Sequence, residues 1–188
     1  MIMVVTFQED LRDNLCSFLL KKGYEVCIPP HRQDVCSLVK EKHPLVIVLD
    51  MYVAEPNGLQ VLRDLRAQYY KGKFVVLAGT SISQVMPQAL SLGIDQVVGG
   101  PQGIGGPIQF EEVEAAIRMA LHPAIAARAF ELYEARDRAP GKALEDWLEA
   151  ERHILNKPSP LSASSQSETK TKSDRDAKKT AKARKPSP

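Results

Sequence analysis

The stretch HPLVIVLDMYVAEPNGL, residues 43–59, has the clearest structural pattern in the chain. Its first half is an unbroken apolar run rich in β-branched residues, which is typical of a strand buried on both faces of a sheet. That run ends in one carboxylate, Asp50, and the turn sequence EPNG follows a few residues later. A helical pattern then places Leu59, Leu62 and Leu65 on one face. A buried strand, a turn and an amphipathic helix in this order indicate one unit of a parallel α/β sheet.

The same alternation of short apolar runs and amphipathic stretches extends over residues 1–121. Right-handed crossovers leave few arrangements for such a chain, so we expect an α/β fold with a doubly wound, five-stranded parallel sheet in the order 2-1-3-4-5. The fourth helix contains Pro87, so we expect it to begin close to that residue. The predicted strands cover residues 2–7, 24–28, 45–50, 73–78 and 96–98, and the predicted helices cover residues 11–22, 33–42, 59–65, 84–92 and 110–121.

Two further parts are predicted after His122-Pro123, where we expect the fifth helix to end. Residues 124–155 contain two amphipathic helical patterns separated by the sequence DRAPG, which we interpret as a helical hairpin. A hairpin this short needs to bury its apolar stripes against the first domain, a second copy of the chain or a partner. Residues 157–188 contain a single large apolar residue, Leu161, and therefore predict a disordered tail.

Composition narrows the classes of function. No apolar run approaches the roughly 18 residues of a membrane helix, and no cleavable leader pattern is present, so we expect a cytoplasmic protein without a membrane partner. The three cysteines form no Cys-x-x-Cys pair and the four histidines are dispersed, which argues against disulfides and a zinc site. Residues 1–156 carry a net charge of −4, whereas residues 157–188 carry +6. The basic tail could therefore bind nucleic acid or an acidic partner.

Sequence motifs of common enzymes are absent. No serine lies in a Gly-x-Ser-x-Gly context. The glycine-rich loop at residues 99–107 lacks both the later glycine of a dinucleotide site and the Gly-Lys-Ser/Thr of a P-loop. We therefore expect no enzymatic activity and no bound nucleotide.

Asp50 lies where doubly wound sheets place their chemistry, beyond the carboxyl end of a central strand. This carboxylate, followed by the Asn-Gly-Leu helix start at residues 57–59, resembles the response regulator receiver domain, which has a flavodoxin-like fold. The likeness covers residues 1–121 and includes the sequence LGID at residues 92–95 and Pro101. It implies that Asp50 accepts a phosphoryl group from a histidine kinase, with Mg²⁺ bridging the carboxylate and the incoming group.

The sequence departs from the family at the residues that hold the metal. The family uses an acidic pair at the end of the first strand, and this chain has Thr6 and Phe7 there. Glu9 and Asp10 could substitute for that pair, although capping the first helix is their simpler role. The candidate Mg²⁺ ligands are therefore Asp50, Glu9, Asp10 and the backbone carbonyl of Tyr52.

Three other positions also lack the residue that the family uses for phosphorylation or for its readout. Ala78 replaces the hydroxyl residue that ends the fourth strand, although Thr80 lies two residues on. Gly100 aligns with the lysine after the fifth strand, and Val97 aligns with the aromatic switch residue. The sequence therefore predicts a degenerate receiver that works as a protein-interaction module in two-component signalling. Two alternatives stay open: a phosphorylatable switch through Asp50, and a nucleic-acid-associated protein that binds through its tail.

The predicted hairpin also resembles a known family. Its segments RAFELYEAR, residues 128–136, and LEDWLEAE, residues 144–151, are similar to a short bacterial domain of unknown function, which implies no activity. The expected partners are thus a histidine kinase or another two-component protein, a second copy of the chain, and nucleic acid at the tail.

Overall fold

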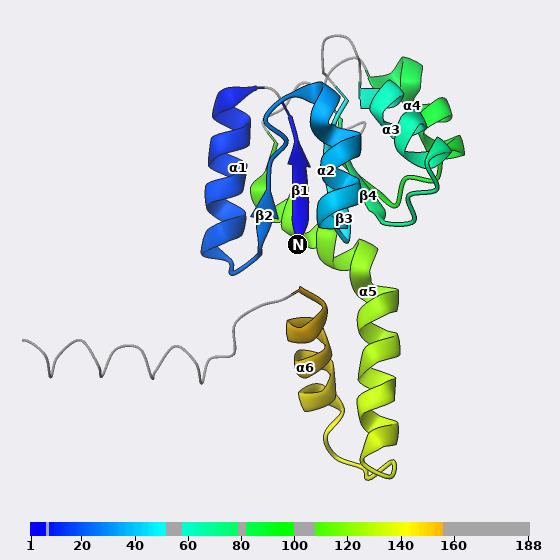
Figure 1. Ribbon diagram of the computed structural model, residues 1–188. Helices are drawn as coiled ribbons and strands as arrows, with labels where there is room; N and C mark the ends of the chain where they lie inside the picture. Colours follow the sequence, from blue (N-terminus) through cyan, green and yellow to red (C-terminus); the bar gives the residue numbers. More distant parts are fainter. Residues whose placement is uncertain (7, 52–57, 79–81, 100–107, 156–188) are drawn as a thin grey trace, which may run out of the picture. The chain divides into compact units, whose positions relative to one another are not determined.

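The computed structural model describes residues 1–6, 8–51, 58–78, 82–99 and 108–155 (Figure 1). Its strands are β1 (Ile2–Val5), β2 (Val26–Cys27), β3 (Val46–Asp50), β4 (Lys73–Leu77) and β5 (Gln96–Val98). Its helices are α1 (Glu9–Lys21), a 3-10 turn η1 (Arg32–Asp34), α2 (Val35–Lys42), α3 (Gly58–Ala67), α4 (Ile82–Ser91), α5 (Phe110–Ala135) and α6 (Ala143–Leu155).

The predicted disordered tail, residues 157–188, lies outside the described residues. None of the helices in the described ranges combines the length and the apolar character that crossing a bilayer requires.

The five strands form one parallel sheet in the order β2-β1-β3-β4-β5, which confirms the predicted topology. β1 and β3 lie inside the sheet and are buried along their whole lengths. The strand order reverses between these two strands, because β2 lies on one side of β1 and β4 lies on the other side of β3. Their carboxyl ends therefore meet at the edge where doubly wound sheets place their chemistry.

Alternate residues of the strands pack into two cores, one on each face of the sheet. Val4 and Val48 point to the face that α1 and α5 cover. Val5 and Leu49 point to the opposite face, which α2, α3 and α4 cover (Figure 1). β1 consequently consists of apolar residues throughout, and β3 is apolar at every position before Asp50, as the unbroken run in the sequence indicated.

The prediction that the fifth helix ends before His122-Pro123 is wrong. α5 continues through Pro123 to Ala135, so the predicted boundary between residues 121 and 124 lies inside one helix. A proline inside a helix removes one hydrogen bond and crowds the preceding turn, at a cost of about 3 kcal/mol. Leu121 and Ile125, on either side of the proline, are both buried in the core on the α1 side. Their burial offsets the local cost of the proline and keeps the helix continuous.

α4 also contains a proline, and its start lies two residues before the predicted one. The helix begins at Ile82, five residues before Pro87, and the proline lies inside it. Ala89, in the turn after the proline, is fully buried in the core that α2 and α3 also line. Tertiary packing therefore decides the limits of both helices against the local preference of their prolines.

α5 and α6 form an antiparallel pair that is joined to the sheet. Ala150 and Leu155 of α6 belong to the same buried cluster as Ile2 of β1 and Leu19 of α1. The apolar stripe of the predicted hairpin thus packs on the first domain, one of the three alternatives that the sequence left open. The buried core on this side of the sheet therefore extends to Leu155, the last residue of α6.

Polar contacts also join the two helices. The Arg118 guanidinium of α5 donates to the buried Glu151 carboxylate of α6, and Arg136 donates through two nitrogens to Asp146. The His122 ring stacks near Trp147, with 4.9 Å between the ring centroids. Because Glu151 and Asp146 are both buried, these arginines provide the partners that a buried carboxylate needs.

Leu155 tests whether α6 belongs to the same cooperative unit as the sheet. Its side chain is 2% exposed in the core, whereas that of Leu144, on the same helix, is 71% exposed. Leu155→Ala should lower the free energy of unfolding by about 2–3 kcal/mol, because it leaves a cavity in that core. Leu144→Ala should change it by less than about 0.5 kcal/mol. Urea denaturation followed by circular dichroism measures both values, and equal small effects would contradict the packing of α6 on the sheet.

Candidate functional site

Asp50 is the last residue of β3, at the carboxyl edge of the sheet. β3 pairs with β1 on one side and β4 on the other, with Leu49 opposite Val5 and Asp50 opposite Leu77. Thr6, the residue after β1, consequently lies next to Asp50. The Asp50 carboxylate is only 3% exposed, although it ends a strand.

Two neutral side chains from the end of β1 hold this carboxylate. The Thr6 hydroxyl donates a hydrogen bond of 2.8 Å to Oδ2 of Asp50, and the Gln8 side-chain amide donates one of 3.2 Å to the same oxygen. The backbone N–H of Gln8 donates in turn to Oγ1 of Thr6, at 3.4 Å. The short segment between β1 and α1 is therefore organised around Asp50.

The hydrogen bonds explain how a carboxylate can remain buried at this edge. Removing a carboxylate from water is costly unless donors replace the lost solvent. A hydrogen bond to a charged group contributes about 1.5–3 kcal/mol, and leaving such a group without its donor costs at least as much. Thr6 and Gln8 supply these donors without adding any charge of their own.

The donor set around Asp50 does not fit a magnesium site. Mg²⁺ is bound by oxygen lone pairs, usually from carboxylates, carbonyls and water. Thr6 and Gln8 both direct hydrogen atoms at Oδ2, which is the reverse of what a cation needs from its neighbours. Of the two positions where the resemblance implies an acidic pair, Thr6 thus acts on Asp50 as a hydrogen-bond donor, and Phe7 lies outside the described residues.

Glu9 and Asp10 are not grouped with Asp50 into a metal site. Glu9 and Asp10 are exposed in the first turn of α1, where negative charge is favourable at the helix N-terminus. In the described parts of the chain, no group of three or more His, Cys, Asp or Glu side chains could hold a metal ion, so Glu9, Asp10 and Asp50 form no such group. Tyr52, whose carbonyl was the fourth predicted ligand, lies outside the described residues.

Gly58 brings the start of α3 against the end of β3. A Cβ atom at this position would lie 2.6 Å from the backbone oxygen of Asp50 and 3.0 Å from Cα of Met51. Real Cβ atoms do not approach backbone atoms so closely, so only glycine fits here. The Asn-Gly-Leu sequence that suggested the family therefore has a steric reason: α3 begins directly beside the Asp50 backbone.

The residues at the ends of β4 and β5 supply no hydroxyl group or charge. Ala78 is buried directly after β4, and its N–H donates to the carbonyl of Val98 in β5. Val97 packs against the core on the α3 side. Thr80 and Gly100, the remaining two positions of this set, lie outside the described residues.

Gln8 is the site residue that sequence reasoning missed. It precedes α1 with an extended backbone, at φ −79° and ψ 107°. Side chains two residues apart point to the same side of an extended chain, so Gln8 and Thr6 can both reach Asp50. The available signal was therefore the two-residue spacing of polar side chains beyond the end of the first strand.

Comparison with known families identifies the domain that contains the sheet. Residues 2–104 match the sequence model of the family described as "Response regulator receiver domain". The chain belongs to the response regulator receiver family. This receiver is similar to the two-component response regulator PhoP of Pseudomonas aeruginosa, with 28% identity over 120 residues. The match covers 64% of this chain and 51% of PhoP, so it spans about half the length of that relative.

Solved structures show the same fold at low sequence identity. The receiver domain of NtrX from Brucella abortus is similar with a TM-score of 0.56 and 19% identity, over 65% of this chain and 98% of that domain. A CheY-like receiver domain protein from Methanospirillum hungatei is similar with a TM-score of 0.57 and 17% identity, over 65% of this chain and 93% of that protein. Receivers of this family typically bind Mg²⁺, which makes the neutral donors at Asp50 notable in this chain.

A second family model matches the C-terminal part of the receiver chain. Residues 120–156 match a family described as "Protein of unknown function (DUF2934)". The match includes the second half of α5 and all of α6, together with Trp147 and the paired residues Arg136 and Asp146. The resemblance of residues 128–151 to a short domain of unknown function is thereby confirmed.

Substitution of Thr6 tests its role at the buried carboxylate. Thr6→Val keeps the shape of the side chain but removes the donor, so it should lower the free energy of unfolding by about 1.5–3 kcal/mol. Thr6→Ser keeps the hydroxyl and should cost less than about 1 kcal/mol. Chemical denaturation of both variants at neutral pH gives the comparison. A valine variant as stable as the serine variant would contradict the proposed hydrogen bond.

Proposed function

We propose that this receiver is degenerate and works as a protein-interaction module in two-component signalling. The observation that carries the proposal is the pair of hydrogen bonds from Thr6 and Gln8 to Oδ2 of Asp50. They supply the contacts that the carboxylate needs to remain buried, and they do so without a cation. On this proposal the receiver fold is kept for its surface rather than for phosphoryl transfer.

The chemistry of phosphoryl transfer supports this reading. A carboxylate and an incoming phosphoryl group are both negative, and the transfer depends on cations that neutralise the charge shared between them. Thr6 and Gln8 stabilise the carboxylate but carry no positive charge, and both direct a hydrogen-bond donor at Oδ2. Asp50 is consequently stabilised as it stands and is poorly prepared for attack on a phosphoryl donor.

The proposed partners follow from the family. The similarity to a two-component response regulator supports a histidine kinase, or another protein of a two-component pathway, as the binding partner. On this proposal the protein acts in the cytoplasm, binds its partner through the surface of the receiver, and has no enzymatic activity of its own.

A phosphorylatable receiver is the rival proposal, and one observation favours it. Asp50 is retained at the end of β3, and Gly58 keeps α3 close to it, as expected for an acceptor aspartate in this family. The two proposals agree on the fold and on the pathway. They differ only in whether Asp50 forms an acyl phosphate.

Intact mass spectrometry separates the two proposals. The full chain is incubated with acetyl phosphate and Mg²⁺, alongside an Asp50→Asn variant that cannot form an acyl phosphate. We expect no mass gain in either protein, because Thr6 and Gln8 donate hydrogen bonds to Oδ2 of Asp50 and bring no carboxylate that would bind Mg²⁺ beside it. A gain of one phosphoryl group in the parent chain, absent from Asp50→Asn, would establish the rival proposal.

A further inference from the structure

A cavity lies between the C-terminal ends of α2 and α3, formed by side chains far from Asp50 in sequence. Its volume is about 270 Å³. Val39 of α2 and Leu65 of α3 are its buried apolar residues. The residues that line the cavity are Cys36, Val39, Lys40, His43, Leu65, Gln68, Tyr69, Tyr70 and Lys71. A small apolar cavity of this kind can hold one or two side chains of a ligand.

The rim of this cavity is basic. Lys40, His43 and Lys71 are exposed on it, and no aspartate or glutamate is among the lining residues. Among the residues that the structure describes, neither Lys40 nor Lys71 makes an ion pair within the chain. The charge of the rim is therefore available to a ligand, and the complementary ligand is an anion.

Two strained residues line the same cavity. His43 ends α2 with φ +47°, and Tyr69 follows α3 with φ +60°; only two other non-glycine residues in the described ranges have a positive φ. The backbone N–H groups of Tyr69 and Tyr70 donate to the carbonyls of Arg66 and Leu65, a helix ending that normally uses glycine at the first of these positions. A large side chain in this conformation is unfavourable, and such strain is concentrated at functional sites.

Burial does not compensate the strain at Tyr69. Its side chain is 87% exposed at the edge of the cavity, so its ring gains little from packing within the fold. Tyrosine is among the residues that contribute most to protein interfaces, because it adds a large rigid surface at low entropic cost. A strained, exposed tyrosine beside an apolar cavity is thus explained by an interaction that the isolated chain does not make.

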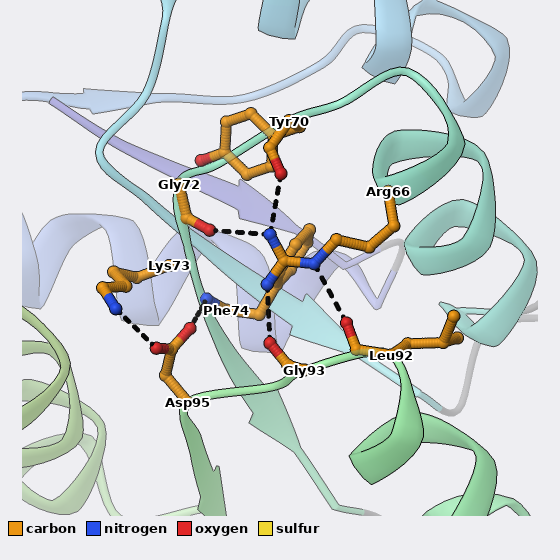
Figure 2. Close-up of polar contacts among 8 residues, drawn as sticks. All are labelled: Arg66, Tyr70, Gly72, Lys73, Phe74, Leu92, Gly93 and Asp95. Atoms are coloured by element: carbon orange, nitrogen blue, oxygen red, sulfur yellow. Dashed lines mark hydrogen bonds and ion pairs between the residues drawn. The ribbon is translucent and has the colours of Figure 1, made fainter.

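The turn that carries Tyr69 is held by hydrogen bonds from Arg66 and Tyr70. Arg66 donates to the carbonyls of Tyr70, Gly72, Leu92 and Gly93, at 2.7, 3.2, 3.0 and 2.6 Å, and its guanidinium lies over the Phe74 ring (Figure 2). The Tyr70 hydroxyl donates to the carbonyl of Pro44, at 2.8 Å, and so joins the turn after α3 to the turn after α2. Both turns that line the cavity are therefore fixed before any ligand binds, which lowers the cost of binding.

We propose that this cavity is the docking site for an acidic segment of a protein partner. One apolar side chain of the partner fills the cavity against Val39 and Leu65, and carboxylates beside it pair with Lys40 and Lys71. The C-terminal residues 157–188 of this chain are unsuitable occupants, because their net charge of +6 has the same sign as the rim. The proposal rests on the proposed interaction role and assigns that role a surface.

A peptide titration tests the site on the full chain. The probe is an unlabelled nonapeptide with one central phenylalanine among aspartates and glutamates, and its control is the same peptide with asparagine and glutamine in their place. Two-dimensional NMR spectra of the ¹⁵N-labelled protein report binding residue by residue. We expect saturable shifts at residues 36–43 and 65–71 with the acidic peptide and none with the neutral one. Shifts confined to the basic residues 178–185, or no shifts at millimolar peptide, would overturn the proposal.

Variants separate this site from nonspecific attraction. Lys71→Glu and Lys40→Glu should each weaken binding by about tenfold, because each reverses a charge that faces the ligand. Lys21→Glu, at an exposed position of α1, is the matched control and should leave the affinity unchanged. Equal affinities of Lys71→Glu and Lys21→Glu would contradict the docking site.

Tyr69→Gly distinguishes a functional tyrosine from a merely structural one. Glycine relieves the positive φ, so the thermal midpoint should rise, while peptide affinity should fall by about fivefold through loss of the aromatic contact. A higher midpoint with unchanged affinity would remove Tyr69 from the site.

Concentration-dependent shifts at residues 36–43 and 65–71 without peptide would identify a second copy as the occupant and would overturn the proposal. Phosphorylation of Asp50 in the acetyl phosphate experiment would contradict the inert role but would leave peptide binding here unaffected.

Discussion

A carboxylate buried at the end of a central strand imposes the main constraint on this protein. The sheet places Asp50 between β1 and β4 and leaves it almost without solvent, so its charge has to be met by neighbouring groups. In this chain the segment after β1 provides a hydroxyl and an amide for that purpose. The same edge is closed from the other side by α3, whose first residue is a glycine because no larger residue fits beside the Asp50 backbone. The fold therefore has the architecture of a receiver around Asp50, and among the described residues Thr6 and Gln8 supply neutral donors to it.

The periodicity of the sequence was sufficient for the sheet but not for the limits of its helices. Unbroken apolar runs predicted β1 and β3 as doubly buried strands, and the alternation of elements predicted the strand order, both of which the structure confirms. The helix end expected before Pro123 was predicted from local preference and was wrong, because Leu121 and Ile125 are buried on either side of the proline and hold α5 through it. Local rules fail where tertiary packing contributes more than the residue's own preference.

Only part of the candidate site could be predicted from the sequence. Asp50 and Thr6 could be located from the strand pattern and the resemblance, since both lie at the ends of predicted strands. The role of Gln8 could not be located in this way, because a hydrogen bond across 42 residues of sequence depends on the position of the chain after β1 has ended. The cavity between α2 and α3 was equally hidden, because it depends on a left-handed backbone at His43 and Tyr69, which for tyrosine is uncommon.

The central claim is that the hydrogen-bonded Asp50 site does not bind Mg²⁺, and an NMR titration with MgCl₂ tests it most directly. The amides of Thr6, Gln8, Asp50 and Gly58 report on the site in the ¹⁵N-labelled full chain, and Thr6→Asp restores one carboxylate as a positive control. We predict that millimolar Mg²⁺ leaves these signals unchanged in the parent chain and produces saturable shifts in Thr6→Asp, where two adjacent carboxylates require a cation. Saturable shifts at the same amides in the parent chain would contradict the account and support a functional metal-binding receiver.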